Sequence, residues 1–374
     1  MSEARGSRGA LYRFFAGRTL AECLGSGRDN FLVLRLVAAL MVVLGHSFLL
    51  VGGDVHVDEP LHRILPRTYS HLAGVAMFFA ISGYLITLSY ERRPDLVRFV
   101  RARVLRLWPA LVVVVAAWAF VLGPVLTTLA PREYFGAGDD HGTAYRYFWS
   151  NISLFRLWPW LPGLFESNPV ARHVNGSLWT IPWEATMYVG VALAGVLRLL
   201  RYPWLASLLI LAIIVALVLW PIYANDAAAT GVLPLGYELA ACFGAGSIAC
   251  LLRRLMPVST GIMLLLALLA LAGRDTLLVW PAILYFVFWL AYVPRLPAMP
   301  READLSYGTY LWAFPVQQTV VQLTGMTSPL ALFAIATPIV LAVAAASWLL
   351  VERPALRLRN RSRPAKDPAT AGAW

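Results

Sequence analysis

The segment from Phe31 to Val51 constrains this chain most, because it is apolar over about 20 residues, the length that one helix needs to cross a bilayer. Arg35 and His46 are its two ionisable residues. They lie eleven positions apart, about three helical turns, so both side chains project from nearly the same face, roughly 16 Å apart along the axis. Ionisable groups at this depth are costly and often mark a functional site. Alternatively, the arginine snorkels to the interface and the histidine bonds a neighbouring helix.

The rest of the chain repeats this apolar pattern. Hydrophobic residues make up 59% of the sequence and charged residues only 14%, against about 25% charged in a typical soluble domain. We therefore predict an all-α polytopic membrane protein with about ten transmembrane helices. The apolar runs lie near 31–52, 72–90, 109–128, 178–198, 203–223, 232–252, 257–273, 276–293, 304–324 and 330–351.

The basic residues predict how these spans are oriented. With the N-terminus in the cytoplasm, the inner segments hold 23 of the 31 Lys and Arg residues and the outer loops hold seven. This bias follows the positive-inside rule and places both termini in the cytoplasm. It also explains the net charge of +11 by topology and anionic lipid, not by a nucleic-acid partner. We divide the chain into a basic N-terminal segment (1–30), a transmembrane domain (31–356) and a basic tail (357–374).

Arginines also gather after the second apolar run, at helical or near-helical spacing. Guanidinium groups pair well with phosphates, and guanidinium and indole planes can stack on a base. The run therefore suits a nucleotide-bearing ligand at the cytoplasmic side, although ordinary positive-inside anchoring explains it as well. The run contains Arg98, Arg101, Arg103 and Arg106 and ends at Trp108-Pro109.

Two later spans carry polar groups. Glu184 is the only carboxylate in the run 178–198, where Trp179 and Trp183 flank it. A carboxylate at this depth pairs with a cation or takes part in proton transfer, and His46 is a possible partner. Tyr310 lies in an otherwise largely apolar run, where hydrogen-bonded packing explains it as well as a functional role does.

Outer-loop histidines and the cysteines do not predict a metal site. His56, His62 and His71 lie in or beside the first outer loop, but their spacing is irregular and unlike that of metal ligands. The three cysteines are scattered without a ligand pattern. We expect no metal.

Six motifs, in this order along the chain, resemble the acyltransferase-3 family of integral membrane O-acyltransferases. The resemblance extends from about Phe31 to Leu356. The motifs are Arg35 with His46, FFAISGYLI, the RxxR-type run through Arg103 and Arg106, GSLWTIPWE, LSYGTYLWAFP and SWLLVERPAL.

The resemblance implies a ten-helix membrane domain that moves an acyl group, commonly acetyl, from cytoplasmic acyl-CoA to a hydroxyl. The acceptor would be an outward-facing glycan or a lipid-linked saccharide. Family members modify lipopolysaccharide O-antigen, exopolysaccharide, peptidoglycan, Nod factors and some antibiotics. The expected location is the bacterial inner membrane, with acetyl-CoA or another acyl-CoA as donor and membrane lipid as a further partner.

Residue roles follow from the matched motifs. The resemblance implies that His46 is the catalytic base, Arg35 its functional partner and Glu184 the acidic residue of the outer motif. The resemblance implies that Arg103 and Arg106 meet the CoA phosphates at the cytoplasmic entrance, with Arg101 as a neighbour. The other residues expected at the donor site are Trp108, Ser82, Gly83 and Tyr84, the last three lining the channel. Expected acceptor contacts are Trp179 and Tyr310.

One departure and several alternatives remain open. Many family members carry histidine where this chain has Ala313, which excludes a mechanism that needs a second histidine there. His46 could deprotonate the acceptor for direct attack or be acylated first. A secondary transporter or a structural membrane scaffold would also contain buried polar residues. The outer loop from about 130 to 175, rich in tryptophan, is a second candidate region for acceptor contacts.

Overall fold

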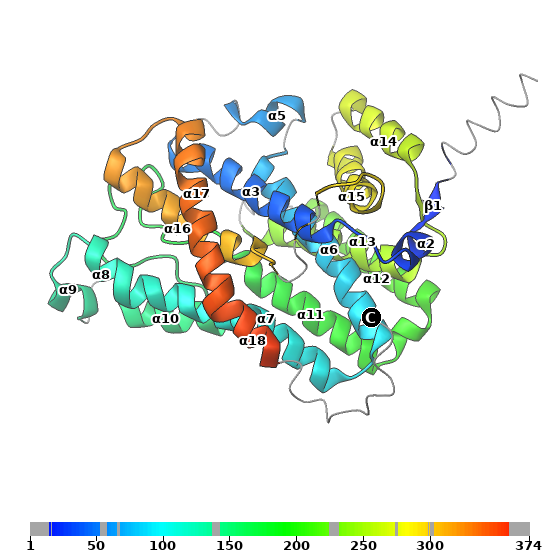
Figure 1. Cartoon of the computed structure of the whole chain (residues 1–374), viewed down its shortest axis with the longest axis horizontal. Helices are drawn as coiled ribbons and strands as arrows, with labels where there is room; N and C mark the ends of the chain where they lie inside the picture. The colour runs from blue at the N-terminus through cyan, green and yellow to red at the C-terminus, as the bar shows by residue number, and fades with distance from the viewer. Residues whose placement is uncertain are drawn as a thin grey trace, which may run out of the picture.

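A computed structural model describes residues 15, 17–52, 58–65, 68–136, 143–223, 232–273, 276–297, 299 and 303–358. This part of the chain is predominantly helical, with a single two-stranded antiparallel sheet between β1 (Arg18–Thr19) and β2 (Pro257–Val258). Figure 1 shows the helices packed side by side around α3, α6 and α13.

The helices are α2 (Leu20–Gly25), α3 (Phe31–Leu50), α5 (Pro60–Ile64), α6 (Ser70–Arg92), α7 (Leu96–Ala117), α8 (Gly123–Leu126), α9 (Pro131–Phe135), α10 (Ala144–Ser153), α11 (Thr180–Val196), α12 (Pro203–Tyr223), α13 (Val232–Leu251), α14 (Thr260–Gly273), α15 (Thr276–Tyr292), α16 (Ser306–Thr324), α17 (Pro329–Ser347) and α18 (Arg353–Leu358). Two π-helical segments, η1 (Trp118–Leu122) and η3 (Trp348–Glu352), continue α7 and α17, and a 3-10 turn, η2 (Leu199–Arg201), follows α11.

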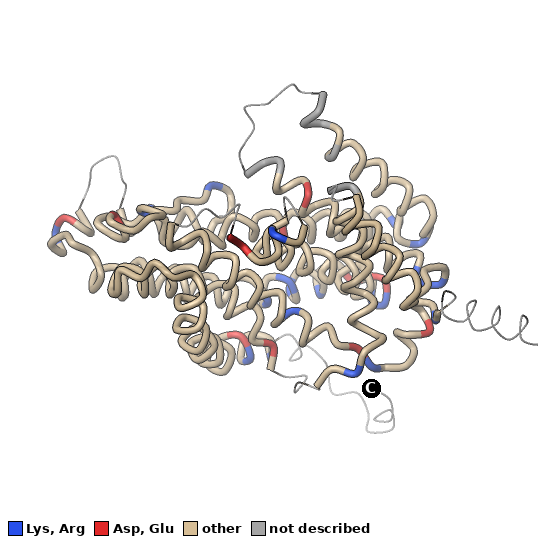
Figure 2. The backbone as a smooth tube through the Cα atoms, turned by 90° about the horizontal axis from the view of Figure 1, so that it is seen from above, with Lys and Arg blue, Asp and Glu red and all other residues tan. Residues whose placement is uncertain are grey.

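Each of the ten predicted apolar runs coincides with a helix. Among the described residues, four helices are long and apolar enough to cross a membrane: Phe31–Leu50, Ser70–Arg92, Leu96–Leu126 and Pro329–Leu358. Four shorter apolar helices lie at Pro203–Leu217, Leu235–Leu251, Thr260–Gly273 and Leu278–Tyr292. Figure 2 shows long stretches of backbone without a charged residue. The number of spans and the side of each terminus stay predictions, and residues 1–14 and 359–374 lie outside the described residues.

The arginine run from Arg98 to Arg106 lies inside α7, part of a helix long and apolar enough to cross a membrane, and does not precede that helix. We expected the third span to begin near residue 109, but α7 begins at Leu96, where the Asp95 side chain accepts a hydrogen bond from the Arg98 backbone N–H. Asp is a favoured N-cap residue because it satisfies such an orphan donor. Pro109 lies inside the helix, and the buried residues Ala110 and Leu111 that follow it hold the helix against the core.

Close backbone packing joins α6 to its neighbours. At Gly83 in the middle of α6, a Cβ atom would lie 2.0 Å from the Phe243 carbonyl oxygen of α13. Only a residue without a side chain therefore permits this approach of the two helices. Gly83 thus faces the α6–α13 contact, and the neighbouring Tyr84 is fully buried against Phe31 and Phe288.

Replacing Gly83 with alanine should destabilise the protein by about 1–3 kcal/mol, because overpacking forces α6 and α13 apart. The measurement is the melting temperature of purified protein in detergent. The control is Gly190→Ala on α11, where nothing lies within 4 Å of the added Cβ. Equal melting temperatures for both variants would contradict the packing role of Gly83.

Candidate active site

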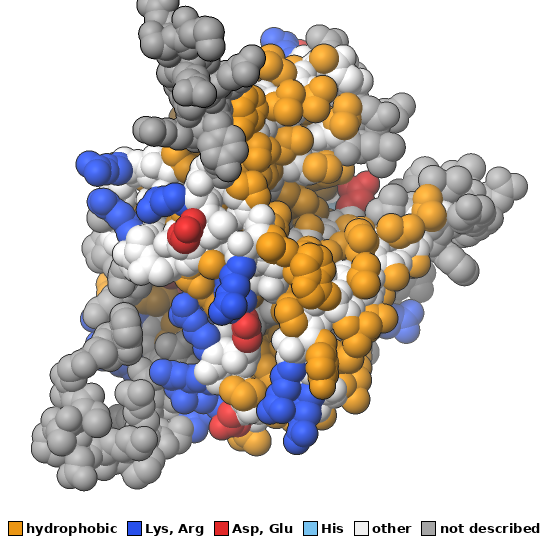
Figure 3. Space-filling view, turned by 90° about the vertical axis from the view of Figure 1, so that its right-hand side faces the viewer, with side chains coloured by type: hydrophobic (Ala, Val, Ile, Leu, Met, Phe, Trp, Pro, Cys, Tyr) orange, Lys and Arg blue, Asp and Glu red, His pale blue; other side chains and the backbone are white. Residues whose placement is uncertain are grey.

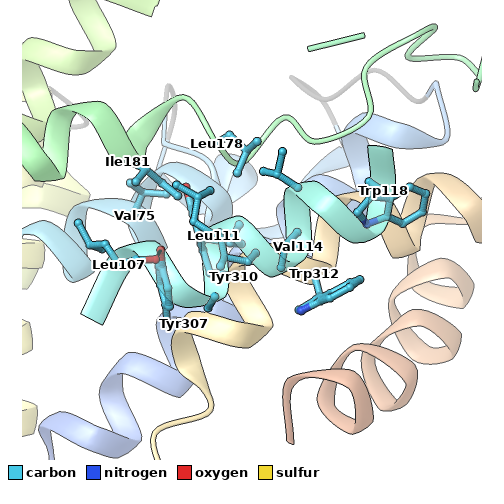
Figure 4. Close-up of a cluster of buried hydrophobic side chains, with 14 of the residues drawn as sticks. Val75, Leu107, Leu111, Val114, Trp118, Leu178, Ile181, Tyr307, Tyr310 and Trp312 are labelled. Atoms are coloured by element: carbon cyan, nitrogen blue, oxygen red, sulfur yellow. Dashed lines mark hydrogen bonds between the residues drawn. The ribbon is translucent and has the colours of Figure 1, made fainter. Parts of the chain in front are cut away.

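A small cavity of about 40 Å³ lies where α3, α6, α7, α11 and α16 meet. This volume is large enough for about two or three water molecules. Figure 4 shows Tyr307 and Tyr310 close to Leu107, Val75 and Ile181, which form part of its apolar wall. The polar residues that line it are Arg35, Ser82, Arg106, Thr180, Glu184, Tyr307 and Tyr310.

Two arginines of this cavity share one carboxylate. Arg35 of α3 and Arg106 of α7 each donate to Oδ2 of Asp304 at 2.7 Å. The other oxygen, Oδ1, accepts from the hydroxyl and the backbone N–H of Ser306 at the start of α16. Arg106 also lies 3.6 Å from Glu352 of η3. The side chains are 24%, 13% and 12% exposed for Arg35, Arg106 and Asp304, so the network is largely shielded from water and its charges are balanced.

A second polar group lies across the cavity. Tyr188 donates a short hydrogen bond to the Glu184 carboxylate, one turn apart on α11. The Arg103 guanidinium lies 5.7 Å from the ring centres of both Tyr188 and Phe99, a distance at which cation–π attraction operates. Arg103 is therefore connected to Glu184 of the cavity through Tyr188.

His46 lies beyond this cavity and is only 7% exposed. Its ring is 5.6 Å from that of His71 on α6 and meets the Phe314 ring edge-on at 5.1 Å. In the described part of the chain, Nδ1 of His46 and Nδ1 of His71 are both buried without a hydrogen-bond partner. Such unsatisfied buried groups are uncommon and require an explanation.

His46 is one helical turn from the cavity along two different helices. On α6, Val75 lines the cavity and His71 contacts His46; on α16, Tyr310 lines the cavity and Phe314 contacts His46. Four residues of α-helix correspond to about 6 Å. The geometry thus places the histidine next to one end of the cavity, which Arg35, Arg106 and Glu184 line.

The family model described as an acyltransferase domain, that of the acyltransferase-3 family, matches residues 29–349. The chain belongs to the acyltransferase-3 family. It is similar to an O-acetyl transferase of Shigella phage Sf6, with 29% identity over 88% of this chain and 96% of the relative. It is also similar to Nodulation protein 10 of Rhizobium leguminosarum bv. viciae, with 28% identity over 89% of this chain and 94% of the relative. No solved structure matches.

The chain is therefore an acyltransferase, and the residues predicted for its site divide into two groups. Arg35, Ser82, Arg106, Glu184 and Tyr310 come together at the cavity. His46 and Glu184, considered above as a pair, are not joined: Glu184 accepts from Tyr188, and His46 contacts His71 and Phe314.

The other predicted residues lie away from the cavity lining. The Trp108 indole donates to the Ile152 carbonyl of α10 at 3.1 Å, and Arg101 donates to the Leu358 carbonyl at 2.7 Å. Trp179 packs against the core at the start of α11. Tyr310, which does line the cavity, donates to the Ser177 carbonyl at 2.9 Å, and its hydroxyl lies 2.6 Å from that of Thr180.

Sequence reasoning missed Asp304, Glu352 and His71 as members of the site. Asp304 was detectable as an acidic residue just before a helix, where the helix dipole favours negative charge. Glu352 lies in the closing SWLLVERPAL motif, and His71 was considered only as a metal ligand. His56 lies outside the described residues, among which no group of three or more His, Cys, Asp or Glu could hold a metal.

Replacing Asp304 with asparagine should destabilise the acyltransferase by about 3–5 kcal/mol, because two largely buried guanidiniums lose the carboxylate that they share. Asparagine can still accept the hydrogen bonds from Ser306, but its NH₂ group then replaces the oxygen that accepts from Arg35 and Arg106, so the substitution removes the charge together with these two acceptor contacts. The measurement is the melting temperature in detergent, with Asp58→Asn as control. Asp58 forms an exposed pair with Arg63, and its loss should cost at most about 1 kcal/mol. A variant of Asp304 as stable as that control would contradict the role of this carboxylate.

Proposed function

We propose that this acyltransferase moves an acyl group, such as acetyl, from cytoplasmic acyl-CoA to a hydroxyl of an outward-facing glycan or lipid-linked saccharide. The observation that carries the proposal is the line formed by the polar cavity and His46, one turn apart along α6 and α16. The name of the phage relative, an O-acetyl transferase, supports a hydroxyl acceptor. The proposed location is the bacterial inner membrane, with both termini in the cytoplasm.

His46 is the base in this proposal. It takes the proton of the acceptor hydroxyl while the hydroxyl oxygen attacks the thioester carbonyl. The new carbon–oxygen bond forms, the carbon–sulfur bond breaks, and the proton passes to the departing CoA thiolate. An acyl-histidine intermediate is the second possible route. The buried position of His46 favours catalysis because it keeps water away from the thioester.

Charged residues of the cavity bind the donor in this proposal. Arg35 and Arg106 line the cavity next to His46, and guanidinium N–H groups that do not bond Asp304 donate to the polarised thioester carbonyl. Glu184 and Ser82 line the same space, and Arg103 stands at its side near Tyr188. Trp179 and Tyr310, at the beginning of α11 and in α16, are the proposed acceptor contacts. The family assignment does not favour the transporter alternative.

Replacing His46 with alanine should reduce acyl transfer by about 10²–10⁴-fold, the usual contribution of a general base. The measurement is release of free CoA from acetyl-CoA by purified protein in nanodiscs, with CoA binding read in the same sample. His62→Ala is the control, because His62 of α5 stacks on Tyr69 at 4.8 Å and Tyr69 stacks on His71, so two rings separate His62 from His46. An active His46→Ala protein would remove His46 from the mechanism.

A further inference from the structure

A second, larger groove of about 680 Å³ opens where the ends of α6, α11 and α13 meet. Its volume lies within the usual range of about 300–1,000 Å³ for small-molecule sites. Four arginines line it: Arg198, Arg201, Arg253 and Arg254. Figure 3 looks onto the right-hand side of the molecule as drawn in Figure 1 and shows several Arg side chains on that face.

The groove carries an excess of positive charge. The Arg253 guanidinium donates to both oxygens of Glu91, at 2.8 and 2.9 Å, so these two charges compensate each other. Arg198, Arg201 and Arg254 are exposed, and the structure shows no ion pair for them within the described part of the chain. Three guanidiniums directed at one open groove favour a ligand with several negative charges, above all phosphate groups.

The backbone keeps one of these cations at the rim. Arg198 has φ of 60° in the turn between α11 and η2. A left-handed residue is common just after a helix, but glycine usually occupies that position. Non-glycine residues in this conformation are concentrated at functional sites. Arginine at this position thus adds a charge where the fold would accept a residue without a side chain.

Packed side chains connect the groove to the cavity near His46. Tyr90 lines the groove and packs on Phe99 at 5.2 Å, and Arg103 lies over both Phe99 and Tyr188. Tyr188 in turn bonds Glu184 of the cavity. Along α6, Ser82 of the cavity and Glu91 of the groove are nine residues apart, which corresponds to roughly 14 Å. The groove and the cavity are therefore neighbours along α6, joined by packed side chains.

The arginines of the RxxR-type run are less suited to phosphate. Arg106 is already held by Asp304 and Glu352, and Arg103 lies over two aromatic rings. Using them for phosphate would break a buried charge network. The phosphates of a donor need other cations, and the groove offers them.

We propose that Arg198, Arg201 and Arg254 bind the phosphate groups at the nucleotide end of the acyl-CoA donor. The inference rests on the proposed function, because it assigns a site to the proposed donor. The group recognised is a phosphate ester, which an anionic phospholipid also carries. A phospholipid is the second candidate ligand, because an apolar groove of about 420 Å³, which could hold acyl chains, adjoins the basic groove at Leu200. The nucleotide is favoured by the size of the basic groove and by its connection to the cavity.

The test measures CoA binding to the full-length protein in phosphatidylcholine nanodiscs by isothermal titration calorimetry. Arg201→Gln/Arg254→Gln is compared with Arg132→Gln/Arg156→Gln, which removes two exposed charges from segments far from the groove. We expect the first pair to raise the Kd for CoA about tenfold or more. It should also weaken the preference of the wild type for CoA over 3′-dephospho-CoA, and the difference should shrink at high salt. The control pair should leave both properties unchanged.

Each contrary outcome has a separate meaning. If the wild-type protein binds CoA and the groove variant binds it equally well, the inference is overturned and the proposed function stands. Wild-type protein that binds no CoA overturns the proposed function and the inference with it. A second experiment tests lipid binding by measuring, with native mass spectrometry, how much phosphatidylglycerol the wild-type protein and the groove variant retain. Loss of phosphatidylglycerol from the groove variant, with CoA binding unchanged, assigns the groove to a lipid headgroup and overturns the nucleotide assignment.

Discussion

The rest of the site depends on the carboxylate of Asp304. It accepts from Arg35 of α3 and Arg106 of α7, and Ser306 fixes it at the start of α16. Three helices that are far apart in the sequence thus meet at one charge. Two guanidiniums placed among apolar helices without it would carry a large desolvation cost. Because Arg35 is held here, the same helix α3 presents His46 three turns away, beside His71 and Phe314.

The structure arranges three regions along one direction: a basic groove, a small polar cavity and a buried histidine. α6 contributes to all three, through Glu91, Ser82 and His71. The close packing of α6 against α13 at Gly83 holds this helix against its neighbour between the groove and the cavity. In the proposed function, each region binds a different part of the reactants.

Much of the fold could be predicted from local sequence. Each of the ten apolar runs overlaps a helix, because hydropathy over about 20 residues reports on apolar helices. Among the described residues, four of these helices are long and apolar enough to cross a membrane. The start of α7 was misplaced because Pro109 and four arginines resemble a boundary, whereas the Asp95 cap and the buried Ala110 and Leu111 extend the helix through them. Within the site, Arg35, Arg106 and Glu184 were predicted from motifs, whereas Asp304, Glu352 and His71 were missed.

The sequence by itself determined the membrane class, the helix positions and the acyltransferase family, since these follow from composition, periodicity and short motifs. Only the tertiary structure decided which charges pair. Arg35 and Asp304 are 269 residues apart, and Arg106 and Asp304 are 198 apart, so no local pattern joins them. The tertiary structure also placed His71, and not Glu184, beside His46. Partner choice at such separations is set by how helices pack, and packing depends on the whole chain at once.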